Sequence, residues 1–206
     1  MSSEHKDWFQ STRKIIGVGP NFRSFRAQRE LPDEGLPFLF LKSPDSLTGA
    51  EHIYLPSLLT EFVCEVELAV VIGQDVKRIR EEEVSSIVAG CALVNDITAT
   101  AHLDTGRFKM FDQTTPIGPL IPHINPADVT LEMWVNGELK QQDHTSQLLF
   151  SANWLISHLS EMMTLRAGDM ILTGTPANPQ YGRNGDVIEL ISPQLGCHKH
   201  IIHWNL

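Results

Sequence analysis

Short apolar runs that end at glycine or proline recur along this chain, and most of them fit strands better than helices. Residues 15–19 (IIGVG) and 37–42 (PFLFLK) predict strands on either side of a polar segment, 21–36, which fits a loop or a short helix. Residues 62–72 (FVCEVELAVVI) are the clearest strand, because they are rich in β-branched residues and are followed by Gly73. Beyond Glu67, the residues on both faces of this strand are apolar, which predicts burial on both faces.

Two segments show the spacing of an amphipathic helix. Residues 80–94 (REEEVSSIVAGCALV) begin with acidic side chains and continue with apolar residues at helical intervals, which predicts a helix leading into a strand near residue 96. Residues 146–163 (SQLLFSANWLISHLSEMM) give the best helical pattern of the chain. Residues 131–142 alternate around a central Asn-Gly dipeptide, which is typical of a two-residue hairpin.

The last third of the chain predicts further short strands separated by glycine turns, over 169–174 (DMILTG), 186–191 (DVIELI) and 198–204 (HKHIIHW). We interpret the histidines of the last run as part of a surface strand and not as a metal site. Strands outnumber helices and the Rossmann alternation is missing, so the pattern favours a β-rich α+β fold with antiparallel or mixed sheets.

Composition narrows the class of protein. The 206 residues suit one domain, placed at 14–206 after an N-terminal tail, 1–13. A net charge of −9 weighs against nucleic acid and anionic membranes as partners. The sequence shows no apolar run near the roughly 20 residues of a spanning helix, no signal peptide and no CxxC pair among its three cysteines. We therefore expect a cytoplasmic protein with reduced thiols.

Glu65 and Glu67 are the most informative polar residues, because alternation puts both on one face of the strand 62–72, about 7 Å apart. Burying two unpaired carboxylates costs several kcal/mol, so they need a counter-charge. A hard divalent cation such as Mg²⁺ or Mn²⁺ would supply it, with Asp96 as a third oxygen donor at the end of an apolar segment. The alternative interpretation of Glu-x-Glu is a solvated strand face.

Seven segments in order resemble the fumarylacetoacetate hydrolase family, from about residue 14 to residue 203. They are KIIGVGPNF, PFLFLKSPDSLTG, CEVELAVVIG, AGCALVNDIT, FKMFDQTTPIGP, VNGELKQQDHTS and LRAGDMILTGTP. The resemblance implies a β-rich fold with mixed sheets or a β-roll and a few short helices. It also implies a homodimer and a divalent cation, Mg²⁺ or Mn²⁺ (or Ca²⁺ in crystals), held by three carboxylates.

The same resemblance assigns roles to individual residues. The family's metal ligands fall on Glu65, Glu67 and Asp96. Its active-site lysine falls on Lys109 of KMFD, and the threonine beside the substrate falls on Thr175 of TGTP, which makes these two the candidate catalytic residues. The candidate substrate-binding residues are Arg23, Arg26, Lys42 and Gly174.

The departures from the family pattern concern water activation. The family's His–Glu pair, which activates water under a closing lid, is replaced by Phe25 and Gln28 in NFRSFRAQ. An arginine and a glutamine after the metal aspartate become Thr100 and Leu103. These changes weigh against simple hydrolysis. Arginines in the presumed lid suggest a second carboxylate on the substrate, although solvated loop arginines are the simpler explanation.

The leading hypothesis is a metal-dependent enzyme that acts on a small 2-oxo acid, such as an acylpyruvate, oxaloacetate or a related diacid. It would cleave a C–C bond, by hydrolysis or decarboxylation, through a metal-bound enolate. An isomerase or tautomerase of 2-oxo diacids could use the same enolate. A non-catalytic family member that keeps its metal for binding or structure is the alternative outside enzymes.

Overall fold

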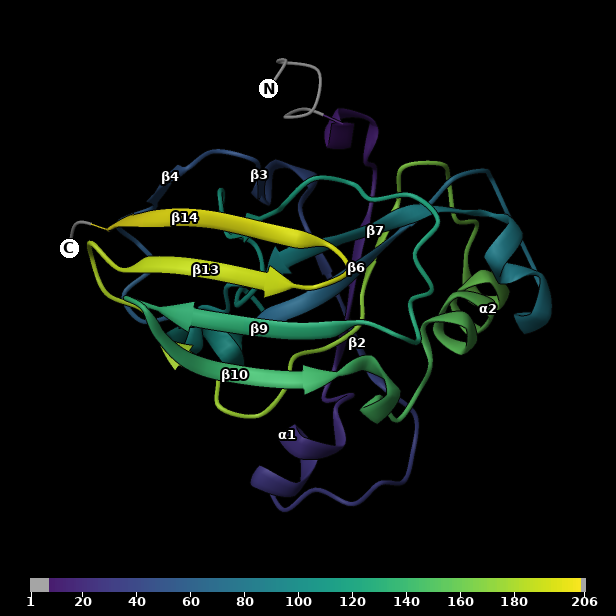
Figure 1. The fold of residues 1–206 in the computed structure, drawn as a ribbon, viewed down its shortest axis with the longest axis horizontal. Coiled ribbons are helices and arrows are strands. Elements are labelled where there is room, and N and C mark those ends of the chain that lie inside the picture. The colour runs from purple at the N-terminus through teal and green to yellow at the C-terminus, as the bar shows by residue number, and fades with distance from the viewer. Residues whose placement is uncertain (1–7, 205–206) are drawn as a thin grey trace.

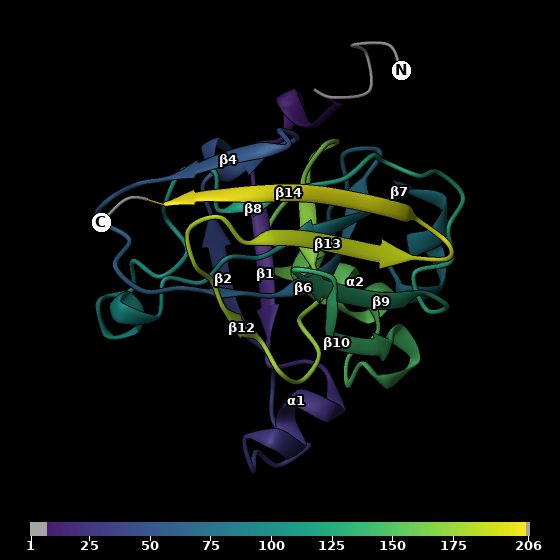
Figure 2. The same cartoon turned by 60° about the vertical axis from the view of Figure 1, so that its left-hand side comes forward.

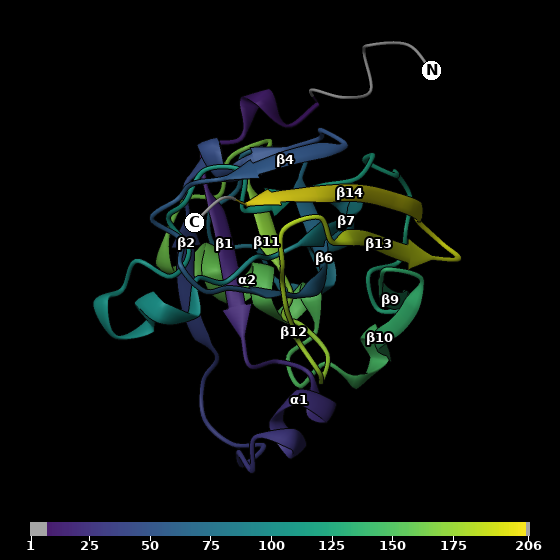
Figure 3. The ribbon, with the colours of Figure 1, turned by 90° about the vertical axis from the view of Figure 1, so that its left-hand side faces the viewer.

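Two five-stranded sheets pack against each other in the computed structural model, which describes residues 8–204 (Figure 1). The first sheet has the order β2 (Phe38–Lys42), β1 (Ile15–Gly19), β11 (Met170–Leu172), β6 (Val66–Ile72) and β7 (Val88–Asn95). The second has the order β10 (Glu138–His144), β9 (Thr130–Val135), β13 (Val187–Ser192), β14 (Gly196–Trp204) and β4 (His52–Leu55). Strands of one sheet run across those of the other (Figures 2 and 3).

Strand pairing is mixed, because β1 runs parallel to β11 and antiparallel to β2, and β14 runs parallel to β4. Two short pairs form separate two-stranded sheets: β5 (Val63–Cys64) with β12 (Gln180–Tyr181), and β3 (Leu47–Thr48) with β8 (Thr115–Pro116). The helices are short: α1 (Arg23–Gln28), α2 (Ala152–Met162) and several 3₁₀ turns. The predicted β-rich α+β class is therefore confirmed. Among the described residues, every helix is too short or too polar to span a bilayer.

Strand β6 is buried along its whole length, as its two apolar faces predicted. Val66, Leu68 and Val70 belong to the larger core cluster, together with residues of the second sheet and of α2. Ala69 and Val71 point the other way, into a smaller cluster that also contains Met170 and Leu172 of β11. Glu67 shares this second face and is buried, so little water reaches its carboxylate.

The prediction of a helix over 80–94 holds only for its first turns and is wrong for the rest of the segment. A 3₁₀ helix spans only Glu81–Ser86, and Val88–Asn95 form β7, antiparallel to β6. The run VAGCALV is apolar on every side, so it matches helical spacing and a doubly buried strand equally well, and pairing with β6 decides between them. At Gly90 the backbone passes so close to Ile121 that a Cβ would lie 2.5 Å from its carbonyl oxygen.

The hairpin and the second helix follow their predictions more closely. Strands β9 and β10 pair around the Asn-Gly turn, where both residues have positive φ. Helix α2 begins later than the pattern suggested, because Ser151 is its N-cap and accepts a hydrogen bond from the Trp154 N–H. The preceding residues Thr145–Gln147 form a 3₁₀ turn.

The proposed N-terminal tail divides into two parts. Residues 1–7 lie outside the described residues. Residues 8–11 form a 3₁₀ turn that packs on the domain, with Phe9 buried in the smaller core cluster and the Trp8 indole donating to the Gly118 carbonyl at 3.2 Å. Thr12 donates to the Gly168 carbonyl at 2.9 Å. This segment is thus part of the domain.

The interpretation of the last strand as a surface strand is wrong for one of its faces. His198 and His200 are buried, because β14 lies inside the second sheet between β13 and β4. The Nε2 of His200 lies 3.0 Å from the amide nitrogen of Asn95, whereas the Nε2 of His198 has no partner among the described residues. Burial lowers the pKa of His198 to about 4.

Because the imidazole of His198 is buried, we expect the folded protein to lose stability in acid. Between pH 6.5 and about 4, the unfolded chain binds a proton at His198 that the folded chain excludes, so the free energy of unfolding falls as the pH falls. The contribution is on the order of 3 kcal/mol when the window is crossed. Urea unfolding of His198→Leu and of the unmodified protein between about pH 7 and pH 4 checks it. Equal pH dependence of the two proteins would refute the prediction.

Candidate metal centre and its pocket

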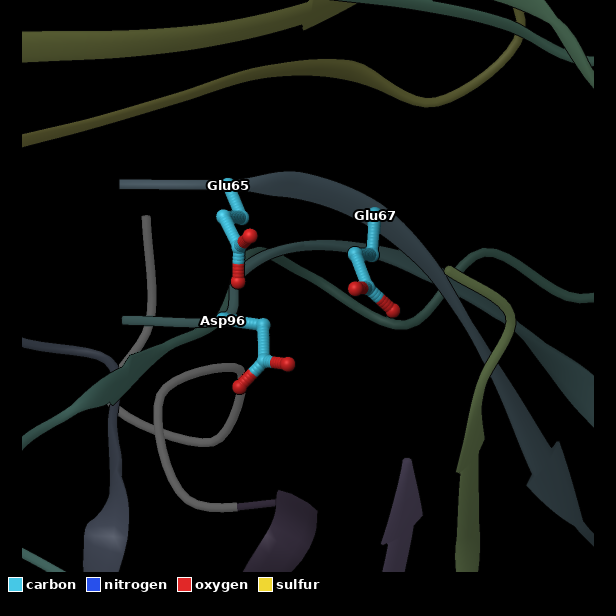
Figure 4. Close-up of side chains that lie close together, drawn as sticks. All are labelled: Glu65, Glu67 and Asp96. Carbon is cyan, nitrogen blue, oxygen red and sulfur yellow. The ribbon is translucent and has the colours of Figure 1, made fainter. Parts of the chain in front are cut away.

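The pairing of β6 with β7 brings the three predicted metal ligands together. Val66 lies opposite Asn95 in the antiparallel register, so Asp96 comes opposite Glu65, and its N–H donates to the Glu65 carbonyl at 2.8 Å. Glu67 follows on the same face of β6. One carboxylate oxygen from each of Glu65, Glu67 and Asp96 lies within 4.8 Å of the others. The three side chains point into one shared space (Figure 4).

Two buried lysines neutralise part of this negative charge. Lys42, at the end of β2, contacts Asp96 with 2.6 Å between Nζ and Oδ1, and it also donates to the Ile97 and Thr114 carbonyls. Lys109 contacts the other oxygen of Asp96 at 2.5 Å and Glu65 at 3.1 Å. Asp96 is therefore held by a lysine on each side, which fixes its orientation.

The electrostatics of the cluster leave one negative charge uncompensated. Burial, reinforced by the charge of Asp96, raises the pKa of Glu67 well above its ordinary value. Burial alone would lower the pKa of Lys109, but the carboxylates of Asp96, Glu65 and Glu67 outweigh it and raise that pKa. Burial lowers the pKa of Lys42 to about 8, although Asp96 opposes the shift.

These residues fit a hard divalent cation. The donors are all carboxylate oxygens, which Mg²⁺ and Mn²⁺ prefer. Glu67 accepts one hydrogen bond from the described residues, the 2.7 Å contact of its Oε2 with the Gly174 N–H, although its side chain is buried. A cation bound between the three carboxylates would balance the surplus charge, so the chemistry of the site agrees with the predicted ligand set.

The loop after β11 supports the cluster from the side. Gly174 has a φ of +102°, and a Cβ there would lie 2.9 Å from the side chain of Asn21, so this position favours glycine. Gln141 accepts a hydrogen bond from the Val66 N–H, which orients its amide so that Nε2 donates to the Thr175 hydroxyl oxygen at 3.0 Å. The hydroxyl hydrogen of Thr175 is then left to donate toward the cavity that this residue lines.

A cavity of about 180 Å³ opens above the carboxylates. Its base is polar, with the three carboxylates, Lys109, Thr98 and Thr175. Its wall is apolar and contains Phe25, Phe38, Phe40, Leu103 and Phe108. The site therefore combines a charged floor with an aromatic wall.

Three of the four predicted substrate-binding residues have side chains that serve other contacts. Arg23 forms an ion pair with Asp33, with 2.5 Å between Nη1 and Oδ2. Arg26 is buried and donates to the carbonyls of Pro20, Pro32 and Glu34, so it holds the loop after α1 in shape. Lys42 is fully buried behind Asp96. In this structure neither arginine lines the cavity, because their guanidinium groups contact Asp33 and backbone carbonyls instead.

Gly174 is the fourth such residue, and its N–H is directed at Glu67. The structure also shows the contacts of Phe25 and Gln28, which stand where the family has its His–Glu pair. Phe25 forms part of the cavity wall. Gln28 exchanges two hydrogen bonds with Asn178, one at 2.8 Å to its side-chain oxygen and one at 2.9 Å from its N–H. Neither residue offers a carboxylate or imidazole to a water molecule.

Sequence reasoning missed three parts of the site. Thr98 donates to Glu65 and lies 2.5 Å from the Nζ of Lys109, and its spacing of two from Asp96 was the available signal. Gln141 had no signal in its local sequence. The aromatic wall could have been predicted from the sequence, because Phe38 and Phe40 are two positions apart in a strand and therefore share one face.

Comparisons with known proteins agree with the fold and identify the family of the chain. The model of the fumarylacetoacetate (FAA) hydrolase C-terminal family matches residues 14–202. The oxaloacetate tautomerase YisK of Bacillus subtilis is 35% identical over 206 residues, covering 90% of this chain and 68% of its own. The 4-hydroxyphenylacetate degradation bifunctional isomerase/decarboxylase of Salmonella dublin is 36% identical over 190 residues, 87% of this chain but only 44% of that protein.

Solved structures show the same architecture. The 5-carboxymethyl-2-hydroxymuconate delta-isomerase from Mycobacterium smegmatis superimposes with a TM-score of 0.87 at 29% identity, covering 95% of this chain and 80% of that one. A 2-hydroxyhepta-2,4-diene-1,7-dioate isomerase from Mycobacterium marinum gives a TM-score of 0.86 at 28% identity, covering 94% of this chain and 75% of that one.

Proposed function

The chain belongs to the fumarylacetoacetate hydrolase family, and we propose that it is a divalent-metal-dependent enzyme that moves a proton at C3 of a small 2-oxo acid. Mg²⁺ or Mn²⁺ is the proposed cofactor, with Glu65, Glu67 and Asp96 as its ligands. The observation that carries the proposal is the position of Lys109 and Thr175 beside this carboxylate cluster, at the floor of one cavity.

The bound cation would act as a Lewis acid toward the 2-oxo group. Solvent water that enters the open cavity would accept the proton that leaves C3. Lys109, kept protonated by the carboxylates around it, stabilises the negative charge that then develops on the substrate oxygen. Thr175 donates its hydroxyl hydrogen to the substrate carboxylate, because Gln141 already occupies its oxygen as an acceptor. Thr98 holds Lys109 in place through their 2.5 Å contact.

The structure favours enolisation over hydrolysis. Hydrolysis of a C–C bond needs a base that deprotonates water, and the dyad positions hold Phe25 in the cavity wall and Gln28 bound to Asn178. Tautomerisation needs no such water. Decarboxylation of a 3-carboxylated 2-oxo acid also passes through an enolate without activated water, and it is the second candidate. For this reason we propose tautomerisation ahead of hydrolytic cleavage.

The test uses oxaloacetate and acetylpyruvate with Mg²⁺. We expect accelerated decay of the enol absorbance with little pyruvate formed, more strongly for acetylpyruvate, which carries one carboxylate, than for the diacid oxaloacetate. The acceleration should be lost when EDTA removes the metal. Pyruvate released from oxaloacetate together with CO₂ would support decarboxylation instead. Pyruvate and acetate released from acetylpyruvate would contradict the preference for enolisation. Failure to turn over a broad panel of 2-oxo acids would favour the non-catalytic family member.

A further inference from the structure

Three phenyl rings form one continuous side of the cavity. Phe38 and Phe40 point the same way from β2, with ring centroids 6.3 Å apart. Phe108 meets both, at 6.4 Å from Phe38 and at 5.8 Å from Phe40 in an edge-to-face arrangement. Such spacings are those of packed aromatic pairs, so the rings make a preformed apolar surface.

The neighbouring strand makes room for this surface. Gly17 of β1 lies opposite Phe40, and a Cβ at Gly17 would lie 2.1 Å from that ring. The ring of Phe40 therefore lies across the glycine. Its centroid is 4.8 Å from the Nζ of Lys109, a cation–π distance, so Phe40 marks the boundary between the charged floor and the apolar wall.

The outer part of the wall is apolar and exposed to solvent. Phe38 is 58% exposed and Leu103 is 56% exposed, at the rim of the same cavity that contains Phe25. Exposed apolar side chains that converge on a pocket mark a binding surface for an apolar group. A substrate fixed by its 2-oxo acid end at the floor would place its substituent against them.

Few positive charges remain for a second carboxylate. Lys109 is the cation that lines the cavity among the described residues, and it is engaged by Asp96 and Glu65. Lys42 is buried behind the floor, and Arg23 is paired with Asp33. A carboxylate placed against the phenyl rings would lose hydration without gaining a partner.

We propose that this pocket selects 2-oxo acids that carry one carboxylate and an aromatic or bulky apolar substituent, and that it discriminates against 2-oxo diacids. The inference rests on the proposed function, because the cation and the floor hold the 2-oxo acid end. It replaces the diacid that the lid arginines suggested, because Arg23 and Arg26 have other partners. The wall residues Phe38, Phe40 and Phe108 are the proposed specificity determinants.

Inert oxamates test the selection without turnover. N-phenyloxamate and N-(carboxymethyl)oxamate share the chelating end and differ only in the group directed at the wall, and oxalate has that end alone. Titration calorimetry of the Mg²⁺-loaded protein gives the three dissociation constants. We expect N-phenyloxamate to bind at least about tenfold more tightly than N-(carboxymethyl)oxamate.

Two variants locate the cause of the preference. Phe38→Arg replaces an exposed rim residue, so the fold is retained, and it should reverse the preference toward the carboxymethyl compound. Tyr181→Arg is the matched control, because Tyr181 is 65% exposed and lies outside the cavity lining. It should leave both constants unchanged.

The outcomes separate this inference from the proposed function. If oxalate fails to bind in the presence of Mg²⁺, the proposed function is wrong. If oxalate binds but the carboxymethyl compound binds as well as the phenyl compound, only the selectivity is wrong. A preference that survives in Phe38→Arg would also overturn the assignment of the rim as the determinant.

Discussion

Replacing Glu67 with glutamine is expected to weaken Mn²⁺ binding by at least about a hundredfold, since loss of an outer-shell partner alone costs a metal site 10–100-fold. The amide still accepts a hydrogen bond from the Gly174 N–H, so the loop after β11 keeps its contact. The variant also removes a buried carboxylate whose pKa is raised by burial and by the charge of Asp96. The metal-free variant should therefore melt no lower than the metal-free parent protein.

Thermal melts with and without Mn²⁺ measure this effect. The unmodified protein should gain stability as Mn²⁺ is added, because the ion binds only the folded state, and Glu67→Gln should not. Glu138→Gln is a suitable control, because Glu138 is an exposed carboxylate paired with Lys140 on β10. Undiminished Mn²⁺ affinity in Glu67→Gln would rule out the assigned site.

Replacing Lys109 with methionine is expected to lower kcat by roughly 10²–10³-fold, which is the usual cost of removing one donor that stabilises a developing oxyanion. Methionine keeps much of the length and apolar surface that packs against Phe40. The bound cation would still balance Glu65 and Asp96, so we expect the affinity for oxalate to change much less than kcat. Steady-state kinetics and oxalate titration, both with Mg²⁺, separate the two effects.

Lys42 provides the contrast, because it contacts the same aspartate but is fully buried behind the floor of the cavity. Lys42→Met should destabilise the fold by about 3–5 kcal/mol, since it leaves part of a buried ion pair uncompensated. Urea unfolding measures this loss. If both lysine variants lost stability equally and kept equal kcat values, Lys109 would have a structural role and the mechanism would need another proton donor or oxyanion partner.

Much of the floor of the site was predictable from sequence. The strand predicted over 62–72 is divided at Glu65 into β5 and β6, but its apolar faces correctly predicted the burial of β6. Two acidic residues at the start of a buried strand require a counter-charge. The family resemblance supplied Lys109 and Thr175 and supported Asp96 as the third ligand, and all three residues line the same cavity. Spacing alone could not do so, because their meeting depends on the register of β6 with β7.

The direction of individual side chains was harder to predict. Arg26 and Lys42 have the charge to bind a carboxylate, but local carbonyls and Asp96 satisfy them in the interior. Strand β7 was predicted as a helix, because a continuous apolar run fits the repeat of a helix and the two-residue repeat of a strand equally well. The same difficulty hid the buried face of β14, whose position inside a sheet is a property of the tertiary fold.

The parallel pairing of β1 with β11 also has a kinetic consequence. Ile15 pairs with Met170, so the two strands are far apart along the chain, and closing so long a loop is slow. Gly174, whose N–H holds Glu67, lies two residues after β11. During synthesis, Glu67 therefore gains its backbone partner only after residue 174 has emerged from the ribosome, so we expect the carboxylate cluster to be assembled late in folding.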